Sequence, residues 1–106
     1  MAVREIPDGG CVEWRPPAGQ ALASLLLQRA GQGVQAYVNV CPHLGLPLNG
    51  RSGEFLLLGP DRLQCAYHCA VFRLADGQCI EGPAVGFALD AVPVEVVAGV
   101  VHVAVP

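Results

Sequence analysis

The sequence predicts an all-β protein folded as a single domain. Thirteen Gly and nine Pro are spread along the 106 residues, and they divide the chain into short apolar runs that suit strands joined by turns. Several of these runs are rich in Val or alternate between apolar and polar residues, as strands do. With 53% hydrophobic and 14% charged residues, the chain has the composition of a folded protein and not of a disordered one.

The first expected hairpin lies near the N-terminus. Residues 3–6 and 11–14 flank Pro7-Asp8-Gly9-Gly10, in which all four residues favour turns. Such a segment reverses the direction of the chain. We therefore expect the two flanking segments to pair with each other.

A second hairpin is expected around Gly31-Gln32-Gly33. Residues 34–40, after this turn, alternate Val and Ala on one face with Gln, Tyr and Asn on the other. Residues 22–29 precede the turn and form the other strand. Because Ala and Leu also favour helix, a short helix over residues 21–28 stays open as an alternative.

A third hairpin is expected near the C-terminus. Residues 94–97 and 100–105 are rich in β-branched Val, and Ala98-Gly99 between them suits a tight turn.

The middle of the chain, residues 41–84, has a different pattern. It holds two of the three His and four of the five Cys, and it has no long alternating run. Four short segments could form strands, with Ala75-Asp76-Gly77 as the turn between the last two: 55–58, 62–64, 71–74 and 78–80. We expect a small sheet that carries two loops.

Charge and cysteine content limit the possible partners and the compartment. Six Arg, no Lys and nine acidic residues give a net charge of −3, which leaves no basic patch for nucleic acid. The apolar runs are too short to span a bilayer and no signal peptide is apparent, so we expect a cytoplasmic protein without membrane contact. Cytoplasmic thiols stay reduced and five Cys cannot all pair, so metal binding explains them better than disulfides.

Two short segments each combine a thiol with an imidazole. They are Cys41-Pro42-His43 and Cys65-Ala66-Tyr67-His68, with twenty-one residues between His43 and Cys65. One or two intervening residues let both side chains of a segment turn to the same side, so the two segments can supply four ligands to one metal centre.

A set of two Cys and two His fits either of two metal centres. One is a tetrahedral zinc site, and the other is a [2Fe–2S] cluster in which two His replace two Cys on one iron. Zinc fingers usually group Cys with Cys and His with His, whereas each segment here has Cys before His. The order favours the cluster, with zinc as the alternative. A nucleophilic Cys–His pair would explain only two of the four residues.

These motifs resemble the Rieske iron–sulfur family, whose signature is C-x-H followed by C-x-x-H. The four ligands of that signature match Cys41, His43, Cys65 and His68. Further landmarks of the family follow in the same order: Gly45, Pro47-Leu48, Phe72, Asp76-Gly77 and the proline loop Glu81-Gly82-Pro83-Ala84. The resemblance covers about residues 41–84.

The resemblance implies a fold and a domain organisation. We expect one Rieske domain over residues 1–106, with an antiparallel β-sandwich base formed by residues 1–40 and 85–106. A small cluster-binding subdomain, about residues 41–84, would carry the two ligand loops.

The resemblance also implies a ligand set and a function. One Rieske-type [2Fe–2S] cluster per chain would be held by Cys41 and Cys65 on the inner iron and by His43 and His68 on the outer iron. The protein would carry single electrons from a reductase to an oxygenase, or serve as a small subunit beside a reductase large subunit, as in nitrite reductase. Such a monomeric carrier is not an enzyme by itself. The alternative of a different class is a zinc-stabilised interaction module without redox activity.

Several positions qualify the resemblance. Cys69 stands where the family usually has Gly, and the segment 51–62 is longer than is common. The membrane-bound members have an extra pair of Cys at the positions of Leu46 and Tyr67 here. Cys11, Cys69 and Cys79 are interpreted as small apolar residues.

The surroundings of the cluster carry two further expectations. Leu44, Leu46, Pro47 and Leu48 would form an apolar rim for brief docking of a partner. High-potential members donate hydrogen bonds to sulfur from a Ser and a Tyr at the positions of Ala70 and Phe72, which cannot donate. The resemblance therefore implies a low reduction potential.

Overall fold

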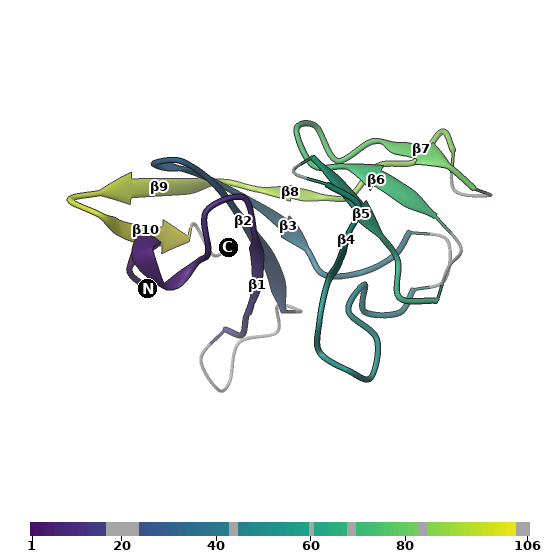
Figure 1. Ribbon diagram of the computed structural model, residues 1–106, viewed down its shortest axis with the longest axis horizontal. Helices are drawn as coiled ribbons and strands as arrows, with labels where there is room; N and C mark the ends of the chain where they lie inside the picture. Colours follow the sequence, from purple (N-terminus) through teal and green to yellow (C-terminus); the bar gives the residue numbers. More distant parts are fainter. Residues whose placement is uncertain (17–23, 43–44, 60, 68–69, 83–84, 104–106) are drawn as a thin grey trace.

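The computed structural model describes residues 1–16, 24–42, 45–59, 61–67, 70–82 and 85–103. Within these ranges the chain forms ten strands in three antiparallel sheets and one turn of 3-10 helix, η1 (Figure 1). The predicted all-β fold is confirmed. No helix in the described part of the chain has the length and apolar character needed to cross a membrane.

The first sheet has the order β1-β2-β3-β8 and contains the predicted second hairpin. Its strands are Cys11–Trp14, Leu25–Ala30, Gly33–Val38 and Ala91–Val92. β2 and β3 are joined at Gly31-Gln32, with Ala30 opposite Gly33. The helix alternative is wrong for residues 25–28, which are strand, and residues 21–23 lie outside the described ranges.

The predicted first hairpin is wrong. Residues Val3–Glu5 form η1, and β1 pairs with β2 instead. Val3 and Ile6 are both buried in the same core, and their spacing of three residues puts them on one side of a helical turn. The turn after Ile6 directs the chain onto Arg29, whose backbone N–H donates to the carbonyl oxygen of Gly10 at 3.0 Å.

The predicted third hairpin is confirmed. β9 (Val94–Val97) and β10 (Val100–Val103) form a two-stranded sheet, while residues 104–105 lie outside the described ranges. Ala98 and Gly99 have φ values of +50° and +76°, and two successive positive values are typical of the tightest hairpin turn.

The predicted small sheet forms in the middle of the chain. It has the order β4-β5-β6-β7, with strands Leu56–Leu57, Arg62–Gln64, Val71–Arg73 and Cys79–Glu81. The turn at residues 75–77 is confirmed, since the N–H of Gly77 donates to the carbonyl oxygen of Arg73 at 2.7 Å. Figure 1 shows this sheet and the β9–β10 hairpin at opposite ends of the molecule.

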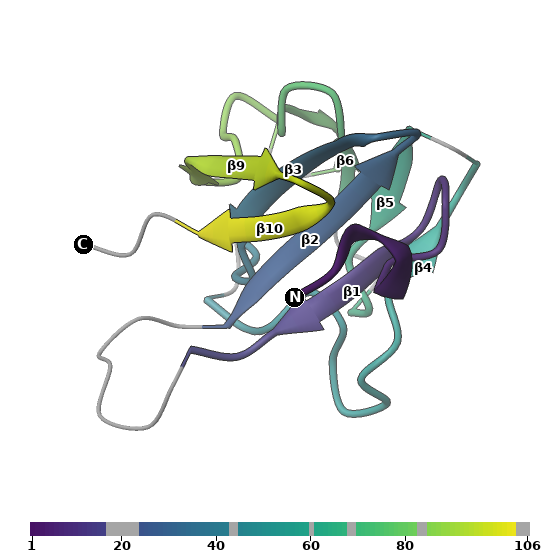
Figure 2. The same ribbon diagram turned by 90° about the vertical axis from the view of Figure 1, so that its left-hand side faces the viewer.

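The β2–β3 hairpin has a hydrophobic core on each face, and Figure 2 shows the β9–β10 hairpin lying across it. The first core lies toward the small sheet and contains Leu26, Tyr37, Cys41, Leu48, Leu63, Cys65, Ala70, Phe72, Leu74, Cys79 and Leu89. The second core contains Val3, Ile6, Leu25, Leu27, Ala36 and Val101. Neighbouring residues of a strand point to opposite faces, so one hairpin supplies both cores.

Candidate metal centre

The first predicted ligand loop begins shortly after β3. Cys41 is fully buried, and its N–H donates to the carbonyl oxygen of Leu46 at 2.8 Å. The carbonyl oxygen of Cys41 accepts from the N–H of Gly45 at 2.7 Å. Gly45 has a φ of +70°, which Gly adopts at no steric cost. The loop is therefore closed by two backbone hydrogen bonds around Cys41.

The second predicted ligand loop connects β5 to β6, and an equivalent hydrogen bond joins its two ends. Cys65 is fully buried, and its N–H donates to the carbonyl oxygen of Ala70 at 2.9 Å. In both loops the Cys thus bonds to the residue five positions later. His43 and His68 fall between the bonded ends, and both lie outside the described residues.

The two loops contact each other through their backbones. The N–H of Ala66 donates to the carbonyl oxygen of Leu48 at 2.9 Å. Gly50 has a φ of +55°, and a Cβ on it would come within 2.8 Å of the Cβ of Ala66. Cys41 and Cys65, which precede these contacts, belong to the same core. The fold therefore brings the two loops together at one end of the first core.

Two buried amides that the sequence pattern does not point to lie beside the first loop. Asn39 and Asn49 are each only 2% exposed, and the Nδ2 of Asn39 donates to the Oδ1 of Asn49 at 2.9 Å. The carboxylate of Glu13 on β1 accepts from both amides at 3.3 Å. The sequence does not predict this network. Asn39 and Asn49 flank the first ligand motif, but Glu13, which accepts from both, is 26 and 36 residues away from them.

Partial burial acts to raise the pKa of the Glu13 carboxyl, but hydrogen bonds to the carboxylate act to lower it. Bonds from Ser24, Asn49 and Asn39 and the positive charge of Arg15 together lower that pKa below its ordinary value. Glu13 is therefore a carboxylate at neutral pH, and a carboxylate can only accept hydrogen bonds.

The other described cysteines have structural surroundings. Cys11 packs against the first core, and burial raises the pKa of its thiol to about 12. The thiol is therefore protonated at neutral pH. Cys79 is buried in the first core, where its Sγ lies 3.1 Å from the carbonyl oxygen of Glu81. Cys69 lies outside the described residues.

The predicted apolar rim is only partly correct. Leu46 and Pro47 are exposed, as is Tyr67 of the second loop. Leu48, in contrast, is fully buried, because its side chain packs in the first core. Its carbonyl oxygen also accepts the hydrogen bond from Ala66 of the second loop. Leu44 lies outside the described residues, as do Pro83 and Ala84 of the predicted proline loop.

Ala70 and Phe72 border the second loop on the side of the first core. Both are buried, and neither side chain carries a hydrogen-bond donor. Phe72 is opposite Leu63 in the small sheet. The described surroundings of Cys65 are therefore apolar on this side.

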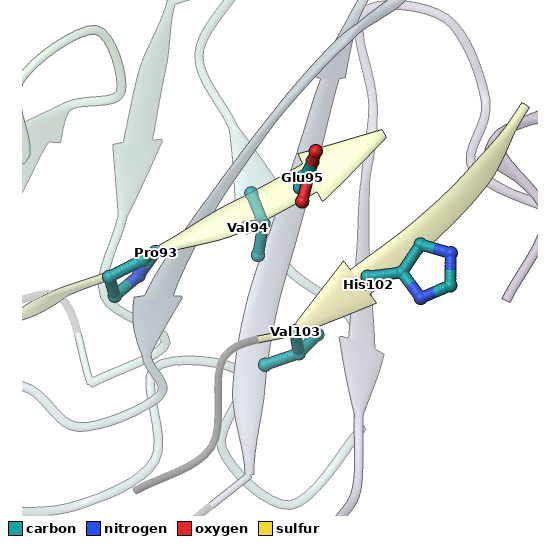
Figure 3. Close-up of a pocket in the computed structure, with 5 residues that line it drawn as sticks. All are labelled: Pro93, Val94, Glu95, His102 and Val103. Carbon is teal, nitrogen blue, oxygen red and sulfur yellow. The ribbon is translucent and has the colours of Figure 1, made fainter. Parts of the chain in front are cut away.

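A surface pocket of about 300 Å³ lies on the β9–β10 hairpin (Figure 3). It is lined by Pro93, Val94, Glu95, His102 and Val103. None of these five residues belongs to the first core. The pocket is therefore not part of the candidate metal centre.

The donor set fits an iron–sulfur cluster. Cys41 and Cys65 are buried in one core at the start of two joined loops, and each loop contains one His in the sequence. Two thiolates for one iron and two imidazoles for the other are the mixed ligation of a [2Fe–2S] centre with two His. Among the described residues alone, which omit both of these His, no three Cys, His, Asp or Glu form a metal site.

Comparison with known proteins gives a family and a set of similar structures. The family model "Rieske [2Fe-2S] domain" matches residues 2–95, which is most of the chain. No curated protein sequence matches.

Three of the similar structures come from carbazole 1,9a-dioxygenase systems. One is a complex of reduced oxygenase and oxidized ferredoxin; the matched chain is 27% identical, with a TM-score of 0.76 over 97% of this chain and 87% of that one. The second is the terminal oxygenase from Nocardioides aromaticivorans IC177, 28% identical, with a TM-score of 0.75 over 96% of this chain. The third, the terminal oxygenase from Novosphingobium sp. KA1, is 22% identical with a TM-score of 0.77 over 97% of this chain. The match spans only 28% of each terminal oxygenase.

Proposed function

This chain belongs to the Rieske [2Fe-2S] domain family, and we propose that it carries single electrons from a reductase to an oxygenase. The observation that carries the proposal is the pair of closed loops that begin at the buried Cys41 and Cys65. The matched chain in the oxygenase–ferredoxin complex supports it, because it and this chain cover nearly all of each other. A small electron-transfer subunit of a reductase is the second form of the same proposal.

The bound Rieske-type cluster supplies a one-electron couple. In this proposal Cys41 and Cys65 hold the inner iron, and His43 and His68 hold the outer iron. The chain's described residues do the rest: Leu48 and Phe72 exclude water from the buried side, while Leu46 and Tyr67 offer exposed apolar surface beside the loops.

The same arrangement supports a low reduction potential. Rieske centres span about −150 to +300 mV, and hydrogen bonds to sulfur raise the potential because they stabilise the reduced state. Neither the Ala70 side chain nor the Phe72 side chain can donate such a bond. A potential near the low end suits electrons that come from a reductase and go to an oxygenase in the cytoplasm.

The metal content tests the proposal first. The purified protein is expected to contain about two iron and two acid-labile sulfide per chain, to be coloured, and to lack zinc. A flavin-containing reductase should reduce it, and the reduced protein should support product formation by an oxygenase. A colourless protein with one zinc per chain would restore the interaction-module alternative, which the family match does not support.

Voltammetry at neutral pH tests the potential. Ala70→Ser and Phe72→Tyr each add a hydroxyl next to the second loop and should raise the potential. Val71→Thr adds a hydroxyl between these two positions at a residue that is not part of the first core, and it is the matched control. A wild-type value well above zero, or no rise in either variant, would contradict the low-potential proposal.

A further inference from the structure

The proposed function does not by itself explain the buried polar network beside the first ligand loop. Burying an amide costs free energy unless its hydrogen bonds are made, and an apolar side chain would fill the same space without that cost. Asn39 and Asn49 are nevertheless both buried, and their amides form hydrogen bonds with each other and with Glu13. Such a network favours one arrangement of the backbone over others.

The network reaches both ligand loops through Leu48. The Oδ1 of Asn39 accepts from the N–H of Leu48 at 2.9 Å. The carbonyl oxygen of Leu48 then accepts from the N–H of Ala66, the residue after Cys65, at 2.9 Å. Asn39 itself precedes Cys41 by two residues. The Asn39 side chain thus joins the chain before the first loop to the chain after it. Through Leu48 it is also connected to the start of the second loop.

Glu13 helps to orient the Asn39 amide, whose Nδ2 also donates to the Oδ1 of Asn49 at 2.9 Å and to the Oγ of Ser24 at 3.2 Å. Its carboxylate accepts from the Nδ2 atoms of Asn39 and Asn49, and its side chain is only 19% exposed. Because a carboxylate cannot donate, both amides must turn their NH₂ groups toward it. The carbonyl oxygen of Asn39 is then left to face the N–H of Leu48.

We propose that Asn39, oriented by Glu13, is a positioning residue that holds the first ligand loop against the second and so fixes how Cys41 and Cys65 hold the cluster. This inference rests on the proposed ligands. Groups that orient metal ligands without touching the metal commonly affect metal retention and electronic structure.

The test compares iron release and EPR spectra of the loaded protein. Asn39→Leu removes every hydrogen bond of the side chain, and Asn39→Asp keeps the acceptor for Leu48 but faces Glu13 with a second carboxylate. Because these changes leave buried polar groups without their partners, a chelator should remove iron at least about fivefold faster from both variants. The EPR line shape of the reduced protein should change as well.

Two further variants keep the test decisive. Leu27→Ala weakens the second core, on the other face of β2, and serves as the control for general destabilisation. It should leave the EPR spectrum unchanged and iron release within about twofold of wild type. Glu13→Gln preserves the size of the side chain but removes one of its two acceptor oxygens, and it should speed iron release in the same direction as the Asn39 variants.

Wild-type spectra and release rates in the Asn39 and Glu13 variants would overturn the inference while leaving the proposed function intact. A Leu27→Ala protein that changes the EPR spectrum as much as Asn39→Leu would also overturn it. A wild-type protein that purifies without iron would instead overturn the proposed function.

Discussion

The two cores on either side of the β2–β3 hairpin differ in the types of residue that form them and in the lengths of the strands around them. The buried residues of the second core are Val, Ile, Leu and Ala, and five strands of four to six residues, the short β8 and η1 surround them. The first core includes three cysteines and a tyrosine, and its small sheet has strands of two or three residues. The two ligand loops, which backbone hydrogen bonds close and join to each other, also border the first core. The candidate metal centre thus lies on one face of the hairpin, whereas the core on the other face is purely aliphatic.

The largest expected effect separates the cysteines of the first core. Cys41→Ser and Cys65→Ser should each lose the cluster completely, because removing a ligand opens a coordination position. Cys79→Ser is in the same core, and Cys11→Ser packs against it; both should keep the cluster. Visible absorption and iron content measure this. If Cys79→Ser lost its iron while Cys65→Ser kept it, the ligand assignment would be wrong.

A matched pair of leucines sharpens the comparison of the cores. Leu27 and Leu63 are both fully buried, in the second and first core respectively. Each Leu→Ala change should lower the free energy of unfolding by about 2–5 kcal/mol, because it leaves a cavity. Only Leu63→Ala should also shorten the lifetime of the cluster. Denaturant unfolding gives the first quantity, and loss of visible absorption on heating gives the second.

Gly77 lies where the turn between β6 and β7 packs against Tyr37 of the β2–β3 hairpin. It has a φ of +76°, and a Cβ there would lie 2.8 Å from the ring of Tyr37 and 3.3 Å from the carbonyl oxygen of Leu89. Gly77→Ala should cost about 2–4 kcal/mol from backbone strain and crowding together. Gly31→Ala, with a φ of +61° and no atom within 4 Å, should cost only the strain of about 1–2 kcal/mol. Equal losses in urea unfolding would show that the contact with Tyr37 is unimportant.

The smallest expected effect is a gain at the far end of the molecule. Among the residues that the structure describes, Ala98 in the β9–β10 turn is the one non-glycine residue with a positive φ, at +50°. Ala98→Asn should stabilise the protein by about 0.5 kcal/mol, because Asn tolerates this conformation and Asn-Gly favours such turns. A small rise in the melting temperature with an unchanged visible spectrum is expected. A shift in the spectrum would show that the two ends of the molecule are coupled.

Local patterns made much of the fold predictable. The hairpins at Gly31-Gln32 and Ala98-Gly99 were identified because turn residues and β-branched neighbours lie next to each other in the sequence. The first hairpin failed because the partners of its residues are remote: the N–H of Val3 donates to the carbonyl oxygen of Gly99. Likewise, spacing pointed to Cys41 and Cys65, but nothing nearby in the sequence links Asn39 to Glu13.

The equal closure of the two ligand loops has a consequence for protein engineering. In each loop the backbone N–H of the Cys bonds to the carbonyl oxygen five residues later, at 2.8 Å in one and 2.9 Å in the other. The unit of the site is therefore a six-residue cassette, residues 41–46 or 65–70, held at its two ends by the rest of the fold. We expect that replacing either cassette with one of the same length and with other donor residues would leave those two ends in place.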